Sequence, residues 1–255
     1  MDFTSIISII KETDLIFFND SFRLDVRKKG DSDFVTRADV EVSEYLRKRL
    51  WETFPNVGFI SEEDEWQGRQ SGDFWILDPI DGTTNFMHDL PFCCISLALL
   101  EGGEITAGVI YSPYTNEIFY AEKGKGAYLN GKKISVSHHA TLADCVGLFE
   151  FNAYYKNETD QALAHARKIY SSCQDIRTFG SAALEFAYIA CGRADVYLGR
   201  YLKPWDFAAG MLLVTEAGGR VGGLDKEIDL FEHHQHVISA NSLVFDEFKS
   251  LLTDR

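Results

Sequence analysis

Apolar residues recur along the chain at two spacings, one typical of helices and one typical of strands. Spacings of three and four residues predict a helix from Phe3 to about Asn19 and a second helix whose buried stripe runs from Val40 to Phe54. Between them, segment 22–39 predicts a β-hairpin with a polar turn at residues 30–33. Two short apolar runs, 57–60 and 74–77, then predict two buried strands.

The rest of the chain passes from a run of strands to an alternation of strands and helices. Residues 92–129 hold four β-type runs separated by turns, and Asn130–Gly131 suits a type I′ turn, so an antiparallel meander is predicted. A helix at 160–170 follows, and strand and helix patterns then alternate to the end, which predicts an α/β layer. We therefore expect a protein of mixed α+β and α/β class, with one domain over residues 1–255 and lobes at approximately 1–140 and 141–255.

Composition narrows the classes of function. The chain has 255 residues, and 25 basic against 39 acidic side chains give a formal charge of −14, which argues against a nucleic-acid partner bound through a basic face. Five cysteines without C-x-x-C spacing argue against a disulfide framework and favour a reducing cytoplasm. We expect no signal peptide and no membrane partner, because no apolar run approaches the roughly 18 residues that a membrane span needs.

Two carboxylates follow the second predicted strand directly. Asp78 and Asp81 are separated by two residues, and Gly82 and Thr83 come next. Carboxylate oxygens bind Mg²⁺, and free N–H groups at a helix start bind phosphate oxygens, so the segment suits a metal and an anion together. The alternative is that the two aspartates only form a turn and that Thr83 only caps a helix.

Other acidic residues have structural interpretations of their own. Asp39 stands three residues after Thr36, which is typical of a capping box. The run Glu62–Glu65 is typical of a solvated edge, but it follows a predicted strand, and α/β proteins bind ligands at strand ends. Asp206 lies in the first turn of a helix opened by Pro204, where it complements the helix dipole unless a partner lies nearby.

Two further segments are candidates for ligand contact. Gly180, Ser181 and Ala182 begin a predicted helix and can approach a ligand there. The cluster His233, His234 and His236 lies in a polar segment, so we expect a solvated loop, with adventitious metal binding as the alternative.

Taken together, the motifs resemble those of the inositol monophosphatase family, within a superfamily of Mg²⁺-dependent, lithium-sensitive phosphomonoesterases. They occur in the family's order and spacing over nearly the whole chain: FISEE at 59–63, WILDPIDGTTNF at 75–86, RTFGSAA at 177–183, KPWDFAAG at 203–210 and EAGG at 216–219. The resemblance implies a layered αβαβα sandwich of the sugar phosphatase type and, usually, a homodimer. It also implies Mg²⁺ as cofactor, with two or three ions, and a small phosphorylated sugar, polyol or nucleotide as substrate.

The resemblance assigns roles to individual residues. The implied Mg²⁺ ligands are Glu62, Asp78, the Ile80 carbonyl, Asp81 and Asp206. Asp39 and Thr83 would orient the attacking water, and Glu63 would support them as a neighbouring acid. The substrate would be held by Ile80, Gly82, Thr83 and Asp206 around the phosphate, and by Gly180, Ser181 and Ala182 around the leaving group.

Elementary chemistry agrees with these roles. A phosphate dianion repels a nucleophile, so a phosphatase must neutralise charge and activate water, and Mg²⁺ ions do both. We expect Mg²⁺-dependent hydrolysis of small phosphate monoesters, most simply inositol monophosphate, in the cytoplasm. Alternatives in the same site are fructose-1,6-bisphosphatase, NADP phosphatase and 3′-phosphoadenosine nucleotidase activity. A different class, a regulatory or binding protein with secondary hydrolysis, is disfavoured because the set of acids is complete.

One position departs from the family pattern. Inositol-type members carry a glutamate that contacts sugar hydroxyls seven positions before the metal-binding aspartate, and this chain has Gly199 there with Arg200 beside it. Arginine offers a planar fork of donors to phosphate, which predicts activity on substrates with a second phosphate. The alternative is that Arg200 points to solvent or into a dimer contact.

Overall fold

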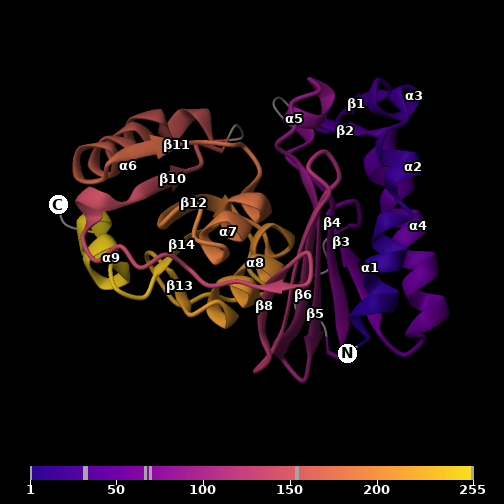
Figure 1. Ribbon diagram of the computed structural model, residues 1–255. Coiled ribbons are helices and arrows are strands. Elements are labelled where there is room, and N and C mark those ends of the chain that lie inside the picture. The colour runs from indigo at the N-terminus through magenta and orange to yellow at the C-terminus, as the bar shows by residue number, and fades with distance from the viewer. Residues whose placement is uncertain (1, 31–33, 66–67, 69–70, 153–154, 254–255) are drawn as a thin grey trace.

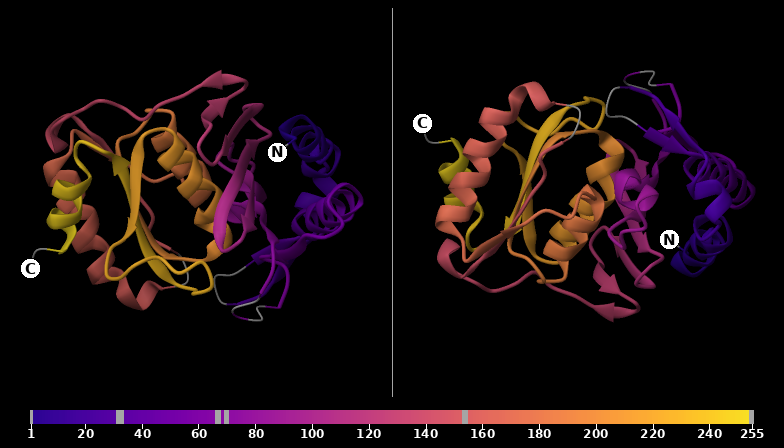
Figure 2. Two further views of the ribbon diagram at one scale, coloured as in Figure 1. Left: turned by 90° about the horizontal axis from the view of Figure 1, so that it is seen from below. Right: turned by 90° about the horizontal axis from the view of Figure 1, so that it is seen from above.

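The computed structural model describes residues 2–30, 34–65, 68, 71–152 and 155–253, and its helices and sheets alternate in five layers (Figure 1). Helices α1 (Phe3–Lys11) and α4 (Arg37–Thr53) form the outer layer beside the first sheet, and α6 (Thr159–Ser172) and α9 (Phe245–Thr253) form the outer layer beside the second. Helices α7 (Ala182–Ala190) and α8 (Pro204–Glu216) lie between the sheets, as Figure 2 also shows from two directions. The predicted layered αβαβα sandwich is confirmed.

The first sheet has seven strands and follows the chain order. Its members are β3 (Gly58–Ser61), β4 (Phe74–Asp81), β5 (Cys94–Glu101), β6 (Glu104–Ser112), β7 (Glu117–Glu122), β8 (Gly126–Leu129) and β9 (Lys132–Lys133). Strands β3 and β4 are parallel, with Ile60 opposite Ile76, and the others pair antiparallel. The meander and the Asn130–Gly131 turn, where both residues have positive φ, are therefore as predicted. Because β3 and β4 are neighbours, the acids after β3 lie beside those at the end of β4.

The second sheet has five strands in the order β11-β10-β12-β14-β13. They are β10 (Val146–Phe149), β11 (Asp175–Arg177), β12 (Val196–Leu202), β13 (Gly219–Gly223) and β14 (Gln235–Asn241), with short 3-10 turns η1 (Leu142–Asp144) and η2 (Lys156–Glu158) nearby. The alternation of strand and helix gives parallel β11, β10 and β12, whereas β14 pairs antiparallel with β12 and β13. Each sheet is apolar on both faces, and three core clusters fill the spaces between the layers.

The N-terminal segment differs from its prediction. In place of one helix to Asn19 the chain forms α1, then α2 (Asp14–Phe17) and α3 (Asp20–Arg23). The break follows from Thr13, whose hydroxyl donates a 2.5 Å hydrogen bond to the Ile10 carbonyl, because this bond competes with continuation of the helix. Strands β1 (Val26–Lys28) and β2 (Phe34–Thr36) confirm the hairpin, and residues 31–33 of its predicted turn lie outside the described residues.

Small residues allow the central helices to approach the first sheet closely. A Cβ on Gly108 of β6 would lie 2.9 Å from the Ala209 carbonyl oxygen of α8, so only glycine fits there. The close packing fixes the N-terminus of α8 relative to β4, and with it the position of Asp206.

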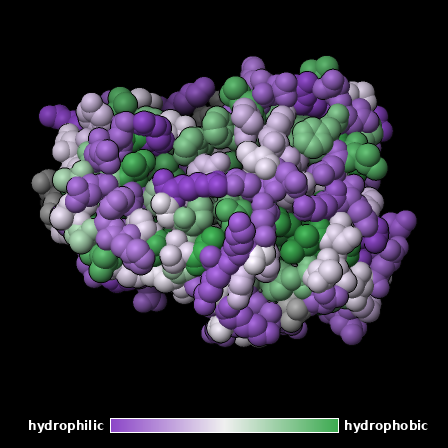
Figure 3. Space-filling view, in the orientation of Figure 1, coloured by the Kyte–Doolittle hydropathy of each residue, from purple (hydrophilic) through white to green (hydrophobic). Residues whose placement is uncertain are grey.

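One face of the molecule is mostly polar. On the face in Figure 3, hydrophilic side chains predominate, and hydrophobic ones appear in small groups between them. Within the described part of the chain, no helix combines the length and hydropathy needed to span a bilayer.

Candidate active site

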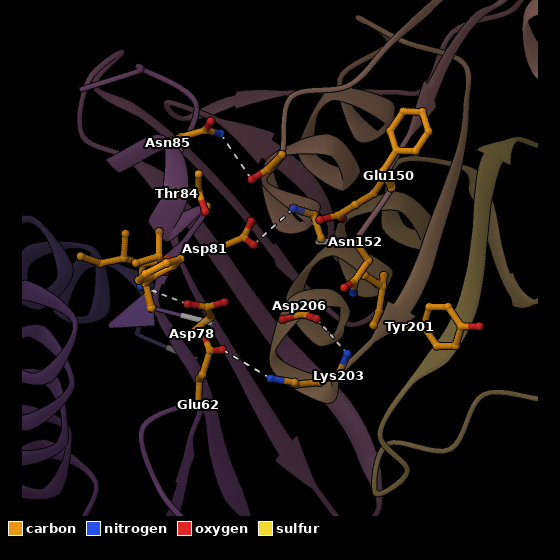
Figure 4. Close-up of a pocket in the computed structure, with 18 of the residues that line it drawn as sticks. Glu62, Asp78, Asp81, Thr84, Asn85, Glu150, Asn152, Tyr201, Lys203 and Asp206 are labelled. Atoms are coloured by element: carbon orange, nitrogen blue, oxygen red, sulfur yellow. Dashed lines mark hydrogen bonds and ion pairs between the residues drawn. The ribbon is translucent and has the colours of Figure 1, made fainter. Parts of the chain in front are cut away.

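A cavity of about 280 Å³ opens where β4 ends and where α5 (Thr83–Met87), α7 and α8 begin (Figure 4). Helix N-termini carry unpaired N–H groups and partial positive charge, so their convergence favours an anion. The lining residues come from both halves of the sequence and include Phe34, Glu62, Asp78, Ile80, Asp81, Gly82, Thr83, Thr84, Asn85, Glu150, Phe151, Asn152, Thr178, Gly180, Ala182, Tyr201, Leu202, Lys203 and Asp206.

Three carboxylates meet on one side of this cavity. One oxygen from each of Asp78, Asp81 and Asp206 lies within 4.8 Å of the others, and the first two residues are buried. Burial first, and then the charges of Glu62 and the other aspartates, raise the pKa of Asp78 and of Asp206 well above the usual range. Carboxylates packed this closely repel one another unless a cation lies between them, so the donor set fits a divalent metal ion.

Asp81 connects the end of β4 to the start of α7. Its carboxylate accepts hydrogen bonds from the Ser181 hydroxyl at 2.5 Å, the Ala182 N–H at 3.2 Å and the Ala183 N–H at 2.8 Å. Burial raises its pKa to about 6 although these donors stabilise the charged form. Gly180 and Ala182 line the cavity, whereas the Ser181 hydroxyl is turned to Asp81, and the contact of this segment with the leaving group stays a prediction.

Gly82 and Thr83 form the start of α5 beside the aspartates. Gly82 has a φ of +90°, and a Cβ there would lie 2.8 Å from the Phe92 carbonyl oxygen, so another residue would be strained and crowded. The Thr83 hydroxyl lies 3.1 Å from the Ile80 carbonyl oxygen and 3.4 Å from an Asp39 oxygen. A helix start that can be approached this closely suits a bound phosphate, and the oxygen acceptors around Thr83 suit a water molecule.

Asp39 forms its predicted structural contact and also faces Thr83, and its role in orienting the attacking water stays a prediction. It forms the predicted capping box of α4, accepting hydrogen bonds from the Thr36 N–H at 2.8 Å and the Thr36 hydroxyl at 2.5 Å. Its other oxygen faces Thr83 across the site. Burial raises the pKa of Asp39 to about 7, opposed by the Thr36 bonds and assisted by the charge of Glu63.

The two glutamates after β3 point in different directions. Glu62 lines the cavity outside the close trio, and one of its oxygens lies 3.6 Å from the Lys203 ammonium (Figure 4). Glu63 does not line the cavity, and its oxygens lie 2.7 and 2.8 Å from the ammonium of Lys29. The catalytic role of Glu63 stays a prediction, since its effect on Asp39 is through charge rather than contact.

Arg200 requires a correction. Its side chain is completely buried and does not line the cavity. Its guanidinium group donates a 3.0 Å hydrogen bond to the side-chain oxygen of Gln161 and lies 3.6 Å from a carboxylate oxygen of Glu158. Neither predicted position, a fork aimed at a second phosphate or a side chain in solvent, is observed. The residue sits in β12 at the irregularity between Gly199 and Leu202, and its side chain faces α6 rather than the site.

The histidine segment is also less solvated than predicted. His236 packs edge-on against Tyr201 with ring centroids 4.5 Å apart, and His233 packs edge-on against Trp205 at 5.2 Å. Burial lowers the pKa of His233 to about 4. These rings support the cavity wall from behind, because Tyr201 itself lines the cavity.

Several lining residues were not singled out from the sequence. Lys203 and Asn85 lie inside the quoted motifs, and Asn85 donates to the carbonyls of Phe92 and Phe179 at 2.7 and 2.6 Å, which joins α5 to the segment before α7. Glu150 belongs to no motif. A charged residue inside the apolar run VGLFEF was its only signal, since acids are seldom buried without a reason.

The fold and the site together define a class, the phosphoric monoester hydrolases built on the sugar-phosphatase sandwich. A family model described as the inositol monophosphatase family matches residues 7–252, and the chain belongs to that family. A fructose-1,6-bisphosphatase/inositol-1-monophosphatase of Thermotoga maritima is 39% identical over 230 residues, which is 89% of this chain and 86% of the relative.

Solved structures agree with the family assignment. The extragenic suppressor protein suhB of Bartonella henselae has a TM-score of 0.91 and 34% identity, covering 99% of this chain and 98% of its own. An IMPase/NADP phosphatase solved with Mg²⁺ and phosphate has a TM-score of 0.86 and 25% identity, covering 98% of this chain and 94% of its own. The protein is thus a phosphomonoesterase with a small phosphorylated substrate.

Proposed function

We propose that this protein is a Mg²⁺-dependent phosphatase acting on inositol monophosphate or a closely similar polyol phosphate. The observation that carries the proposal is the trio Asp78, Asp81 and Asp206, with carboxylate oxygens within 4.8 Å, next to the Gly82–Thr83 helix start. Such oxygen donors suit hard divalent cations, and the solved relative with Mg²⁺ and phosphate supports the choice of metal.

Glu62, Asp78, the Ile80 carbonyl, Asp81 and Asp206 would hold two or three ions. Bound Mg²⁺ supplies charge neutralisation for the phosphate and makes water a better nucleophile. The chain's own contribution is geometric, because Ser181, Ala182 and Ala183 hold Asp81 in place.

Thr83 and Asp39 orient the attacking water. The Thr83 hydroxyl lies between the Ile80 carbonyl and Asp39, and Asp39 is fixed by the Thr36 capping box. Hydrogen bonds to Thr83 and Asp39 fix the orientation of the water molecule. The water is thereby aligned with the phosphorus atom.

Phosphate release with and without Mg²⁺ tests the proposal. We expect release from myo-inositol 1-phosphate that stops in EDTA and returns with added Mg²⁺. Activity that persists in EDTA, or release from no phosphate monoester at all, would contradict it.

A second candidate is action on fructose 1,6-bisphosphate, which the name of the Thermotoga maritima relative favours. The two activities are distinguished by kcat/KM for both substrates on the same preparation. Homodimer formation, lithium sensitivity, the cytoplasmic location, the division into lobes and the absence of a nucleic-acid partner remain predictions.

A further inference from the structure

Glu150 presents a carboxylate to the cavity from the wall that faces the aspartate trio. It follows β10 directly, its N–H donates to the Leu198 carbonyl, and it lines the cavity beside Asn152 and Tyr201. Figure 4 shows these three residues across the cavity from Asp78 and Asp81. A phosphate held at the aspartates therefore directs the rest of the substrate toward Glu150.

One oxygen of Glu150 is held and the other is available. The hydroxyl of the fully buried Tyr197 donates a 3.2 Å hydrogen bond to Oε2. The other oxygen, Oε1, receives no hydrogen bond from the residues that the structure describes. A carboxylate fixed on one side and open on the other is arranged to accept a hydrogen bond from a ligand.

Gly199 leaves room for the side chain that holds Glu150. A Cβ at Gly199 would lie 2.6 Å from the Tyr197 hydroxyl oxygen and 2.5 Å from a Leu202 methyl carbon, so a side chain there would displace one of these groups. The space beside the backbone is filled by the hydroxyl that holds Glu150. The absence of a side chain at position 199 and the placement of Glu150 are thus parts of one arrangement.

The charges of the lining disfavour a second phosphate. Its acidic members are Glu62, Asp78, Asp81, Glu150 and Asp206, and Lys203, the one Lys or Arg among the described lining residues, lies near Glu62. Arg200 faces away from the cavity. Bound cations would lie at the trio and not at Glu150 on the far wall, where a second phosphate would find a carboxyl group in place of a cation and a hydroxyl would find a hydrogen-bonding partner.

We propose that Glu150, positioned by Tyr197, is the specificity-determining residue that binds the hydroxyls of a neutral polyol leaving group and disfavours substrates with a second phosphate. The inference rests on the proposed phosphatase function and names the substrate class for that site. Burial, followed by the charge of Asp81, raises the pKa of Glu150 to about 7, and in either protonation state the group can bond to a hydroxyl.

The test compares three substrates in four proteins. The substrates are myo-inositol 1-phosphate, fructose 1,6-bisphosphate and phenyl phosphate, which has no hydroxyl on its leaving group. The proteins are the parent, Glu150→Ala, Glu150→Gln, and Asp160→Ala as an exposed acid control on α6. Thermal melting establishes that each variant is folded, and calorimetric titration with myo-inositol 1-phosphate in Ca²⁺ measures binding without turnover.

We expect Glu150→Ala to lower kcat/KM for myo-inositol 1-phosphate about ten- to a hundredfold, the effect of losing one hydrogen bond to substrate. Phenyl phosphate should change by less than about threefold, and Glu150→Gln, which keeps a hydrogen-bonding group, should recover part of the loss. In both variants the preference for fructose 1,6-bisphosphate should rise relative to the monophosphate, and Asp160→Ala should match the parent.

Equal losses on phenyl phosphate and myo-inositol 1-phosphate would make Glu150 structural and overturn the inference, as would no loss on either. Failure of the proposed function gives a different result, a folded parent that hydrolyses none of the three substrates. In that case the titration still decides, because unchanged binding of myo-inositol 1-phosphate in Glu150→Ala would refute the role of Glu150.

Discussion

The two walls of the cavity are built differently. The wall that carries Asp78 and Asp81 is built mainly from one continuous strand end and helix start, in which nearly every residue from Asp78 to Asn85 contacts the site, and Glu62 and Asp206 complete it. The facing wall combines Glu150, Asn152 and Tyr201, which come from the ends of two strands far apart in sequence. Most groups suited to metal and phosphate thus come from one segment of the chain. The groups that face the leaving group come from separate segments.

This difference has a chemical origin. Binding phosphate and metal requires several oxygen and N–H groups at fixed separations, and a strand that runs into a helix supplies them at fixed spacing. A leaving group needs only one or two hydrogen-bonding groups at the right distance, and many positions can supply them. Substitutions on the first wall should therefore affect every substrate, and those on the second should affect some.

The largest effect should come from the aspartate trio. Asp206→Asn keeps the shape of the residue but removes a charged oxygen donor, so we expect phosphate release to fall by roughly a hundredfold or more on every substrate. Initial rates at saturating Mg²⁺, with calorimetry of Mg²⁺ binding, measure the change. Turnover near the parent level, with Mg²⁺ affinity unchanged, would show that Asp206 is no ligand.

The first wall and the fold were largely predictable from the sequence. Local sequence patterns predicted the strand before Asp78, the capping box at Thr36 and Asp39, and the helix opened by Pro204. Such patterns are reliable because they depend on neighbouring residues rather than on tertiary contacts. The sequence predicted both β3 and β4 but not that they pair, because strand pairing depends on tertiary structure.

The second wall could not be predicted, for a physical reason. Whether Arg200 or its neighbours face the cavity depends on the register and bulge of β12 against β14, where pairing shifts between Gly199 and Leu202. A shift of one residue exchanges the faces of a strand, and no local pattern reports it. Glu150 likewise gains its role only through contact with Tyr197, 47 residues away.

Thr83 should give the next largest effect, again on all substrates. Thr83→Val removes the hydroxyl but keeps the shape, and Thr83→Ser keeps the hydroxyl, so the pair separates chemistry from packing. We expect Thr83→Val to lower kcat about ten- to a hundredfold with a smaller change in KM, because orienting water matters mainly in the transition state, and Thr83→Ser to stay within about fivefold. A change confined to KM would make Thr83 a binding residue only.

Arg200 should affect stability and leave selectivity unchanged. Arg200→Ala leaves a cavity among buried groups, which costs about 2 kcal/mol or more of unfolding free energy, whereas Arg200→Met fills the space and should stay within about 1 kcal/mol of the parent. Chemical denaturation measures both. The ratio of kcat/KM for fructose 1,6-bisphosphate to that for myo-inositol 1-phosphate should not change. A fall in this ratio in both variants would show that Arg200 does contribute to binding a second phosphate.

The smallest expected effect is a pH dependence behind the second wall, at His233. Burial against Trp205, together with the charges of His234 and Lys203, lowers the pKa of His233 from 6.5 to about 4 in the folded protein. Between these values the unfolded chain binds the proton more readily. The stability that neutral His233 contributes is therefore complete above pH 6.5 and is lost as the pH falls toward 4.

The variant His233→Gln carries no titrating group and should lose less stability over that range. If His233 contributes about 1 kcal/mol, the parent's Tm should drop roughly 2–4 °C further than the variant's between pH 6.5 and 4. Differential scanning calorimetry of both proteins at several pH values measures the difference. Because Lys203 lines the cavity while His233 stands behind it, kcat at pH 7.5 should be similar in the two proteins. Parallel Tm curves would show that His233 titrates alike in the folded and unfolded chains, and that the second wall is more open to solvent than its packing indicates.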